Sequence, residues 1–375
     1  MRKVDFLIVG AGIAGAGMAY RLAGHGDILV CDMEAQADYH TTGRSAAFYA
    51  ETYGGEKVQP LTTCSKDFLR SPPIGFSDLP LITELGAMHI FDADQKPRAF
   101  EMYEAIKNTL PHVKMLDSAE LADRLPPLVE GRFEGGLYDS ECGNLDVTAL
   151  HQGYLRAAKK AGVELLLDAG FESATYADGT WTVELCGHTV KARFIINCAG
   201  AWGDQIAERC GIPLIGLTPM RRTLVTIPNP DGLPFDKKLP VIFDFDENFY
   251  FKPEGAGYLV SPADETLSPP GDCQPEMEDV AIAVDCFERA TGSMVKAVEA
   301  KWAGLRTFAP DRAPVIGFDQ KQTSFFWNVG QGGFGIQTSP AWSRMAASII
   351  LGHGMPDDIT LHGGNPDWYN PARFS

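Results

Sequence analysis

The N-terminal segment passes from an apolar run through a glycine-rich turn into a helix-forming stretch. Val4–Val9 is apolar but for one position, Gly10-Ala11-Gly12-Ile13-Ala14-Gly15 follows, and Gly17–Ala23 has helical spacing. A second apolar run, Ile28–Cys31, ends at Asp32. Strand, helix and strand in this order predict a βαβ unit with two parallel strands.

The hydrophobic pattern changes in the next third of the chain and then returns. From about Leu61 to Asp146 it loosens into short segments separated by proline and glycine clusters, which indicates a separate lobe. Leu145–Ala161 then has the spacing of one amphipathic helix, and Val163–Leu167 is a short apolar run. Phe194–Trp202 again predicts a strand that enters a glycine-containing turn before a helix.

Short apolar runs bounded by turn residues dominate the segment between Leu217 and Phe308. The strands expected here are Arg222–Ile227, Pro240–Phe245, Phe249–Lys252 and Tyr258–Ser261, and one helix, Glu276–Thr291, follows them. Such a series predicts an antiparallel sheet. Near the C-terminus, Phe325–Val329 leads through a third glycine-rich turn into a helix from about Pro340 to Leu351.

These two patterns alternate along the chain and predict two discontinuous domains. We expect residues 1–60, 145–217 and 309–375 to form a Rossmann-like dinucleotide-binding domain. Residues 61–144 and 218–308 would form a second domain built on the antiparallel sheet. The fold class predicted is therefore α/β (α+β).

Composition narrows the function classes. The 375 residues contain 32 Lys and Arg against 49 Asp and Glu, a net charge of −17, so nucleic acid and anionic membrane surfaces are poor partners. No apolar stretch approaches the roughly 20 residues of a spanning helix, and we expect a cytoplasmic protein. The eight cysteines are scattered without metal-ligand spacing, and no metal site is predicted.

The first glycine turn carries the most specific chemistry. Gly10 permits the tight turn, Gly12 allows the backbone to approach a pyrophosphate, and Gly15 allows the helix to pack closely on the strand. The helix N-terminus supplies N–H groups, and Asp32 at the end of the second strand can accept hydrogen bonds from ribose hydroxyls. This context predicts a dinucleotide site, but the turn alone does not distinguish NAD from FAD.

Further motifs point to flavin. Tyr39-His40-Thr41-Thr42-Gly43-Arg44-Ser45-Ala46-Ala47 and Ala199-Gly200-Ala201-Trp202 occur with the block Trp302-Ala303-Gly304-Leu305-Arg306, Pro310-Asp311 and Pro314–Gly317. Together they resemble the D-amino-acid oxidase family of flavoenzymes, which includes glycine and sarcosine oxidases. Within it the likeness is strongest to the bacterial FAD-dependent D-arginine dehydrogenases, over essentially the full length.

The resemblance implies FAD, bound non-covalently, because no cysteine lies in the Gly304–Gly317 block and His40 has a counterpart in D-arginine dehydrogenases without a covalent link. The residues expected to contact FAD are Gly10, Gly12, Ile13, Ala14, Gly15, Asp32, Gly43, Arg44, Ser45, Ala46, Ala199, Gly200, Trp202, Gly332, Gly335, Ile336 and Gln337.

The resemblance also implies that residues 61–144 and 218–308 form the substrate-binding domain. Arg222 and Arg306 match the family's carboxylate-binding arginines, and Tyr250 matches a tyrosine that hydrogen-bonds the same carboxylate. Tyr53 lies in a mobile lid after Ser45, and the carbonyl of Gly333 would accept from the α-amine. Arginine's planar fork suits bidentate carboxylate capture, which agrees with this assignment.

Without the resemblance, these residues have simpler explanations. Arg222 follows Arg221, and an arginine on a strand is as often solvated or ion-paired. Arg306 ends an apolar run, which favours a buried functional charge. Tyr250 and Tyr53 alone would be read as core or surface aromatics.

Two departures change the expected substrate. Phe48 replaces a histidine of the lid, and Ala87 replaces the glutamate that would pair with a basic side chain; Glu51 and Glu84 are acids that could partly substitute. The pocket expected is lined by Phe48, Ala87, Met88 and Gln337. An unpaired guanidinium would be costly in such a pocket, which favours neutral or hydrophobic D-amino acids.

The function expected is FAD-dependent oxidation of a D-amino acid to an imino acid, which water hydrolyses to a 2-oxo acid and ammonia. The electrons would leave as a hydride to flavin N5, with a quinone or O2 as the open choice of final acceptor. Alternatives are oxidation of a secondary amine or imino acid such as sarcosine or D-proline, oxidation of a hydroxy acid, and a non-catalytic flavin subunit that transfers electrons.

Overall fold

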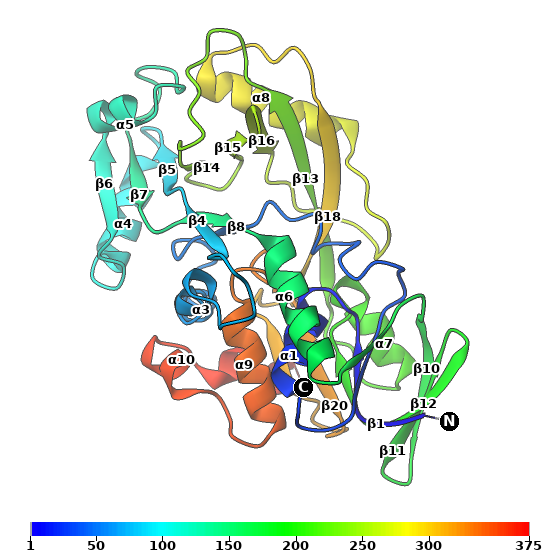
Figure 1. Cartoon of the computed structure of the whole chain (residues 1–375). Coiled ribbons are helices and arrows are strands. Elements are labelled where there is room, and N and C mark those ends of the chain that lie inside the picture. The colour runs from blue at the N-terminus through cyan, green and yellow to red at the C-terminus, as the bar shows by residue number, and fades with distance from the viewer. Residues whose placement is uncertain (1, 375) are drawn as a thin grey trace.

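Two large sheets and one small sheet organise the chain, with the eight-stranded sheet low in the view and most of the ten-stranded sheet above it (Figure 1). The computed structural model describes residues 2–374. Helices pack on both large sheets, so the predicted α/β (α+β) fold class is confirmed.

The eight-stranded sheet has a parallel centre. Its strands are β1 (Arg2–Val9), β2 (Ile28–Cys31), β9 (Glu164–Leu166), β10 (Phe171–Ala177), β11 (Thr180–Leu185), β12 (His188–Asn197), β19 (Val315–Phe318) and β20 (Phe325–Val329). β1 pairs in parallel with β2 and β12, and β12 with β20, whereas β10, β11 and β19 are antiparallel additions at the margins. The carboxyl ends of β1, β2 and β12 therefore meet at one edge, where ligands of open α/β sheets bind.

Three helices cover one face of this sheet. α1 (Ile13–Leu22) packs against both α6 (Val147–Lys160) and α9 (Ser339–Ile350), as Figure 1 shows. The fit is close, because a β-carbon at Gly17 would lie 3.1 Å from side-chain atoms of Ser343 and Trp342 in α9. Another helix, α7 (Gly203–Arg209), packs against β10 and β12.

The ten-stranded sheet is mainly antiparallel. Its strands are β5 (Ala87–Phe91), β6 (Val113–Asp117), β7 (Gly135–Asp139), β13 (Thr218–Pro228), β14 (Val241–Asp244), β15 (Tyr250–Glu254), β16 (Gly257–Ser261), β17 (Thr266–Leu267), β18 (Ala300–Phe308) and β21 (Gln331–Gly332). Only the pair of β14 and β5 is parallel. The long strands β13 and β18 lie side by side, and α8 (Met277–Thr291) covers β13 and β16 (Figure 1).

Short elements complete the described chain. They are β3 (Phe48–Tyr49), β4 (Ile82–Glu84) and β8 (Gly143–Leu145), which form the small sheet, the helices α2 (Gln59–Thr63), α3 (Lys66–Arg70), α4 (Lys96–Ile106), α5 (Ser118–Arg124) and α10 (Asp357–Leu361), and 3-10 turns at Gly200–Trp202, Pro366–Trp368 and Pro371–Phe374. Within residues 2–374 no helix combines the length and apolarity needed to cross a bilayer.

The predicted domain boundaries stay a prediction. The strands of the ten-stranded sheet come mostly from residues 87–139 and 218–308. However, β21 belongs to the segment expected in the dinucleotide-binding domain and pairs with β18. This pairing brings the third glycine-rich turn next to Arg306.

Candidate functional site

The first glycine turn is shaped for close backbone approach. Gly10 has a φ of +98°, a conformation that side chains strongly disfavour. A β-carbon at Gly15 would lie 1.8 Å from the carbonyl oxygen of Gly10. Glycine is thus required at both positions for β1 to turn directly into α1.

The start of α1 leaves hydrogen-bond donors for an anion. Ala11 N donates to Asp32 at 2.6 Å, and Ile13 N donates to the Thr42 hydroxyl at 3.0 Å. The N–H groups of Gly12 and Ala14 have no acceptor within residues 2–374. Unpaired N–H groups at the positive end of a helix dipole fit the pyrophosphate of a dinucleotide.

Asp32 is partly engaged by the protein itself. Besides the bond from Ala11 N, its Oδ1 accepts from Glu34 N at 2.9 Å. Burial raises the pKa of the Asp32 carboxyl, and these backbone bonds oppose the shift. Each carboxylate oxygen has a second lone pair, so Asp32 can still accept from ribose hydroxyls.

One cavity runs from this turn to the ten-stranded sheet and gathers most of the predicted residues. Those that line it are Gly10, Gly12, Ile13, Ala14, Asp32, Arg44, Ser45, Ala46, Phe48, Tyr53, Ala199, Gly200, Trp202, Arg222, Tyr250, Arg306, Gly332, Gly333, Gly335, Ile336 and Gln337. Gly15, Gly43, Ala87 and Met88 do not line it. A cavity that joins the first glycine turn to Arg222 and Arg306 fits FAD with substrate beyond it.

The prediction that Met88 lines the pocket is wrong. Successive side chains of a strand point to opposite faces, and in β5 Ala87 packs in the buried cluster of Tyr53 and Tyr250. Met88 instead packs with Phe287 of α8 on the other face of the sheet. The side chain at position 87 therefore supports the aromatic residues from behind, and Met88 faces away from the cavity.

Arg44 lines the cavity as expected, and its guanidinium also has protein partners. The guanidinium contacts Asp272 at 2.5 Å and donates to the carbonyl oxygens of Cys273 and Ala303 at 2.9 and 3.2 Å. The charge of Arg44 is therefore used to tie the segment after Asp32 to the ten-stranded sheet.

Arg222, Arg306 and Tyr250, which we call the carboxylate clamp, meet because of strand register. Arg222 of β13 pairs with Gly304 of β18, so Arg306 lies two positions farther along the same face. Tyr250 projects from β15 of the same sheet, and all three residues are less than a tenth exposed. Arg306 also donates from Nη2 to the hydroxyl of Tyr53 at 2.8 Å, which joins the lid to the clamp.

The clamp is surrounded by aromatic rings. The ring centroid of Phe48 lies 5.4 Å from that of Tyr53, 5.0 Å from that of Phe243 and 5.9 Å from that of Tyr250. Burial raises the pKa of Tyr250, which keeps its hydroxyl a hydrogen-bond donor. Among the described residues, the only carboxylates that line the cavity are Asp32, Glu34 and Asp38 near the first glycine turn.

Sequence reasoning missed the acid behind the clamp, Glu265. Its Oε1 accepts from Arg306 Nη1 at 3.0 Å, from Arg222 Nη2 at 3.4 Å and from Arg312 Nη2 at 2.8 Å. Burial raises the pKa of Glu265, but the bond from Arg312 and the charge of Arg306 outweigh it and lower that pKa. The only signal in the sequence is an Asp-Glu pair after a predicted strand.

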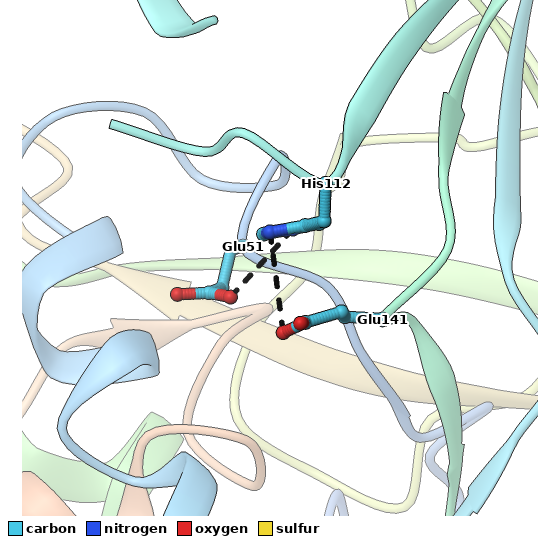
Figure 2. A group of neighbouring side chains, drawn as sticks. All are labelled: Glu51, His112 and Glu141. Carbon is cyan, nitrogen blue, oxygen red and sulfur yellow. Dashed lines mark ion pairs between the residues drawn. The ribbon is translucent and has the colours of Figure 1, made fainter. Parts of the chain in front are cut away.

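A second charged cluster lies behind the lid and contains Glu51, His112 and Glu141, which point toward one another (Figure 2). Lys66 Nζ lies 2.6 Å from Glu51 and 2.7 Å from Glu141, so both carboxylates already share an ammonium partner, which would repel a metal ion. Glu51 is buried here and does not line the cavity, so it cannot replace the glutamate lost at position 87.

Two histidines have structural partners. His40 Nε2 lies 2.9 Å from Glu34 Oε1, and its ring packs on Trp202 at the cavity wall. His151 Nε2 lies 2.8 Å from the carbonyl oxygen of Ala11, and the side chain is fully buried beside the first glycine turn.

Comparisons with known proteins agree with this geometry. The chain is 23% identical over 380 residues to dimethylglycine dehydrogenase of Rattus norvegicus, covering 94% of this chain and 43% of that protein. It is 24% identical to D-amino acid dehydrogenase 3 of Mesorhizobium japonicum, covering 74% of this chain and 67% of that protein. The fold matches a crystal structure of L-proline dehydrogenase from P. horikoshii with a TM-score of 0.84 and 20% identity, covering 100% of this chain and 98% of that one.

The chain spans less than half the length of the dimethylglycine dehydrogenase that it matches. The sequence profile described as "DAO: FAD dependent oxidoreductase" matches residues 5–349, which are nearly the whole chain. With the glycine turn, Asp32 and the long cavity in place, this chain belongs to the DAO family of FAD-dependent oxidoreductases.

Proposed function

We propose that this chain oxidises the Cα–N bond of a D-amino acid with a neutral or apolar side chain. The imino acid product would hydrolyse to a 2-oxo acid and ammonia. The observation that carries the proposal is the carboxylate clamp, two buried arginines and a tyrosine at the end of the cavity far from the first glycine turn.

The clamp would supply position. Arg222 and Arg306 present guanidinium donors on one face of the sheet, and Tyr250 adds a hydroxyl. Binding a carboxylate at these donors fixes the Cα–H bond relative to the flavin, and holding two reactants in a productive geometry removes much of the entropic barrier. Bound FAD supplies the chemistry, since its isoalloxazine ring accepts a hydride from Cα.

The amine must lose its proton to the surroundings. The cavity around the clamp is lined by Phe48, Tyr53, Leu224 and Gln337 in addition to the clamp itself. None of these is a base near neutral pH, so the amine would react in its neutral form or pass its proton to water. The Gly333 carbonyl stays the predicted acceptor for the amine.

The side-chain preference rests on the aromatic lining. Phe48 and Tyr53 line the cavity beside the clamp, with Phe243 packed against both rings, and among the described residues the carboxylates that line the cavity lie near the first glycine turn. A lysine or arginine side chain of a substrate would lose its hydration without gaining a partner. The D configuration rests on the family resemblance and on the D-amino acid dehydrogenase among the relatives.

Oxidation of an N-substituted amino acid is the second candidate. Dimethylglycine and L-proline, named in two of the similar proteins, both carry a substituted amine. The aromatic rings around the clamp could contact N-alkyl carbons or an alkylammonium group as readily as an apolar side chain. A non-catalytic flavin subunit is less well supported, because it has no need of a buried pair of arginines.

The test is an anaerobic titration of the purified flavoprotein with neutral D-amino acids, their L-enantiomers, D-arginine, sarcosine, dimethylglycine and D- and L-proline, followed by the visible flavin absorbance. Bleaching by neutral D-amino acids and not by the L-forms supports the proposal. Bleaching by N-substituted substrates alone favours the second candidate. No bleaching by any of them contradicts both.

A further inference from the structure

Glu265 contacts the two arginines of the carboxylate clamp without entering the cavity. It lies between β16 and β17, it does not line the cavity, and its Oε1 is the shared acceptor of Arg222, Arg306 and Arg312. The single carboxylate of Glu265 thus holds three guanidinium groups through charge-assisted hydrogen bonds.

The donors that Glu265 uses differ from those that face the cavity. Arg306 donates Nη1 to Glu265 and Nη2 to the Tyr53 hydroxyl, and its Nε and Nη2 edge is the part nearest to Gly333 of the cavity wall. Arg222 donates Nε to the carbonyl oxygen of Asp264 at 2.9 Å and Nη2 to Glu265. One edge of each guanidinium is thus fixed from behind, and other N–H groups stay available to a ligand.

The segment that carries Glu265 is itself anchored to β13. The Asp264 carboxylate accepts from the amide and the hydroxyl of Thr223, at 2.6 and 3.0 Å. The Ser261 hydroxyl donates to the Thr223 carbonyl oxygen at 2.7 Å. Glu265 therefore projects from a backbone that is tied to the residue following Arg222.

We propose that Glu265 is a positioning residue, which orients the guanidinium groups of Arg222 and Arg306 for capture of the substrate carboxylate. The inference rests on the proposed function, because it assigns the clamp a carboxylate ligand. Without this acceptor the two guanidinium groups, only a few ångströms apart, would repel each other and leave the orientation that serves the cavity.

The competing explanation predicts the opposite sign. If Glu265 only neutralised the arginines, its removal would increase the positive charge of the site and tighten the binding of an anion. If it orients them, its removal weakens binding, because the ligand must then order the guanidinium groups itself. The direction of the change therefore separates the two roles.

The experiment uses the FAD-loaded protein and benzoate as a carboxylate probe, with its Kd measured from the change in the flavin spectrum. We expect Glu265→Ala to raise the benzoate Kd and the substrate KM by about tenfold, the value of one charged hydrogen bond. Glu265→Gln retains an oxygen acceptor without the charge and should recover part of this loss. Glu299→Gln, at an exposed position away from the clamp, is the matched control and should bind as the parent does.

The role of Glu265 and the proposed function are tested separately, because benzoate binds to the protein without being oxidised. Tighter or unchanged benzoate binding in both Glu265 variants, at unaltered FAD content, would overturn the positioning role. If Glu265→Ala does not fold, Glu265→Gln against Glu265→Asp gives the same comparison. If the parent protein binds benzoate but oxidises no amino acid, the proposed function fails while the role of Glu265 is still decided by the binding series.

Discussion

The guanidinium of Arg306 fills the space that a side chain at position 333 would need. A β-carbon at Gly333 would lie 2.0 Å from Nη2, 2.3 Å from Nε and 2.4 Å from Cζ of Arg306. Gly333 does not require glycine for its φ, which is not positive. Position 333 has room only for glycine because the guanidinium of Arg306 lies against it. The turn before α9 can therefore pack on β18 in this way only while residue 333 has no side chain.

Gly333→Ala should therefore displace Arg306 and lower kcat/KM by at least about a hundredfold, since positioning errors of an ångström have effects of this size. Bound FAD should be retained because the first glycine turn is unchanged. Gly271→Ala is the control, since its β-carbon would meet no atom nearer than 3.9 Å. Steady-state kinetics with near-parental values for Gly333→Ala would show that Arg306 does not need its present position.

Arg306→Lys should abolish most turnover although the charge is kept, because an ammonium cannot make the two parallel bonds of a guanidinium. Tyr53→Phe should lower kcat/KM by about tenfold, since only the bond that Tyr53 accepts from Arg306 is lost. Both variants should keep the parental FAD content. Unchanged kinetics for Arg306→Lys would remove Arg306 from the clamp.

Activity should rise with pH through one ionisation, because Phe48, Tyr53, Leu224 and Gln337 around the clamp offer no base for the substrate amine. The hydroxyl of Tyr250 stays protonated as burial raises its pKa. Measurement of kcat/KM from pH 6 to pH 10 should show a rise and then a plateau. A flat profile over this range would contradict the scheme in which the substrate amine must lose its proton before it reacts.

His89 should weaken the fold in acid. Burial lowers its pKa to about 4, partly opposed by the charge of Asp139, and its ring lies between Thr52 and Phe243. In the unfolded chain the pKa of His89 is about 6.5. As the pH falls from about 6.5 to 4, the unfolded chain therefore binds a proton at His89, whereas the folded protein does not. The stability that neutral His89 contributes above pH 6.5 is lost over this window, by about 3 kcal/mol.

Thermal unfolding tests this sign directly. His89→Gln should be less stable than the parent at pH 7, and the difference in Tm should shrink as pH falls to 4.5. His188→Gln, at an exposed position, should show no such dependence. A difference that widens in acid would mean that His89 is charged in the folded protein.

FAD should leave the protein on denaturation, since the sequence predicts non-covalent binding. Precipitation with acid should leave the flavin colour in the supernatant, as with free FAD added to the apoprotein. Flavin that stays in the pellet would contradict this prediction. His40→Asn would then test the histidine at the cavity wall, whose Nε2 faces Glu34.

Local pattern predicted the first glycine turn correctly because the strand, turn and helix that form it are consecutive in the sequence. β1, α1 and β2 follow within 31 residues, and Asp32 directly follows β2. The helix expected over Leu145–Ala161 begins at Val147, since the side chain of Asp146 caps it by accepting from Ala149 N at 2.8 Å. The antiparallel strands predicted between Leu217 and Phe308 are confirmed, because turn residues mark the ends of these strands in the sequence.

Features that depend on long-range register were not predictable. β5 is buried along its whole length, so its sequence has no alternation to show that Met88 faces α8. Glu265 and Arg306 are separated by 41 positions and meet only when β13, β17 and β18 pair. An acidic residue in a short connection usually lies at the surface, so the sequence does not show that Glu265 pairs with a buried arginine.

The neighbouring arginines of β13 have a consequence for folding. Arg221 donates to the carboxylates of Glu276 and Asp279 beside α8, whereas Arg222 donates to the backbone carbonyl oxygen of Asp264 and to the carboxylate of Glu265 on the clamp side. A slip of one residue between β13 and β18 would exchange their faces and bury each charge without its own acids. The opposite partners of these two neighbouring arginines therefore favour the observed alignment of β13 and β18 over one shifted by a single residue.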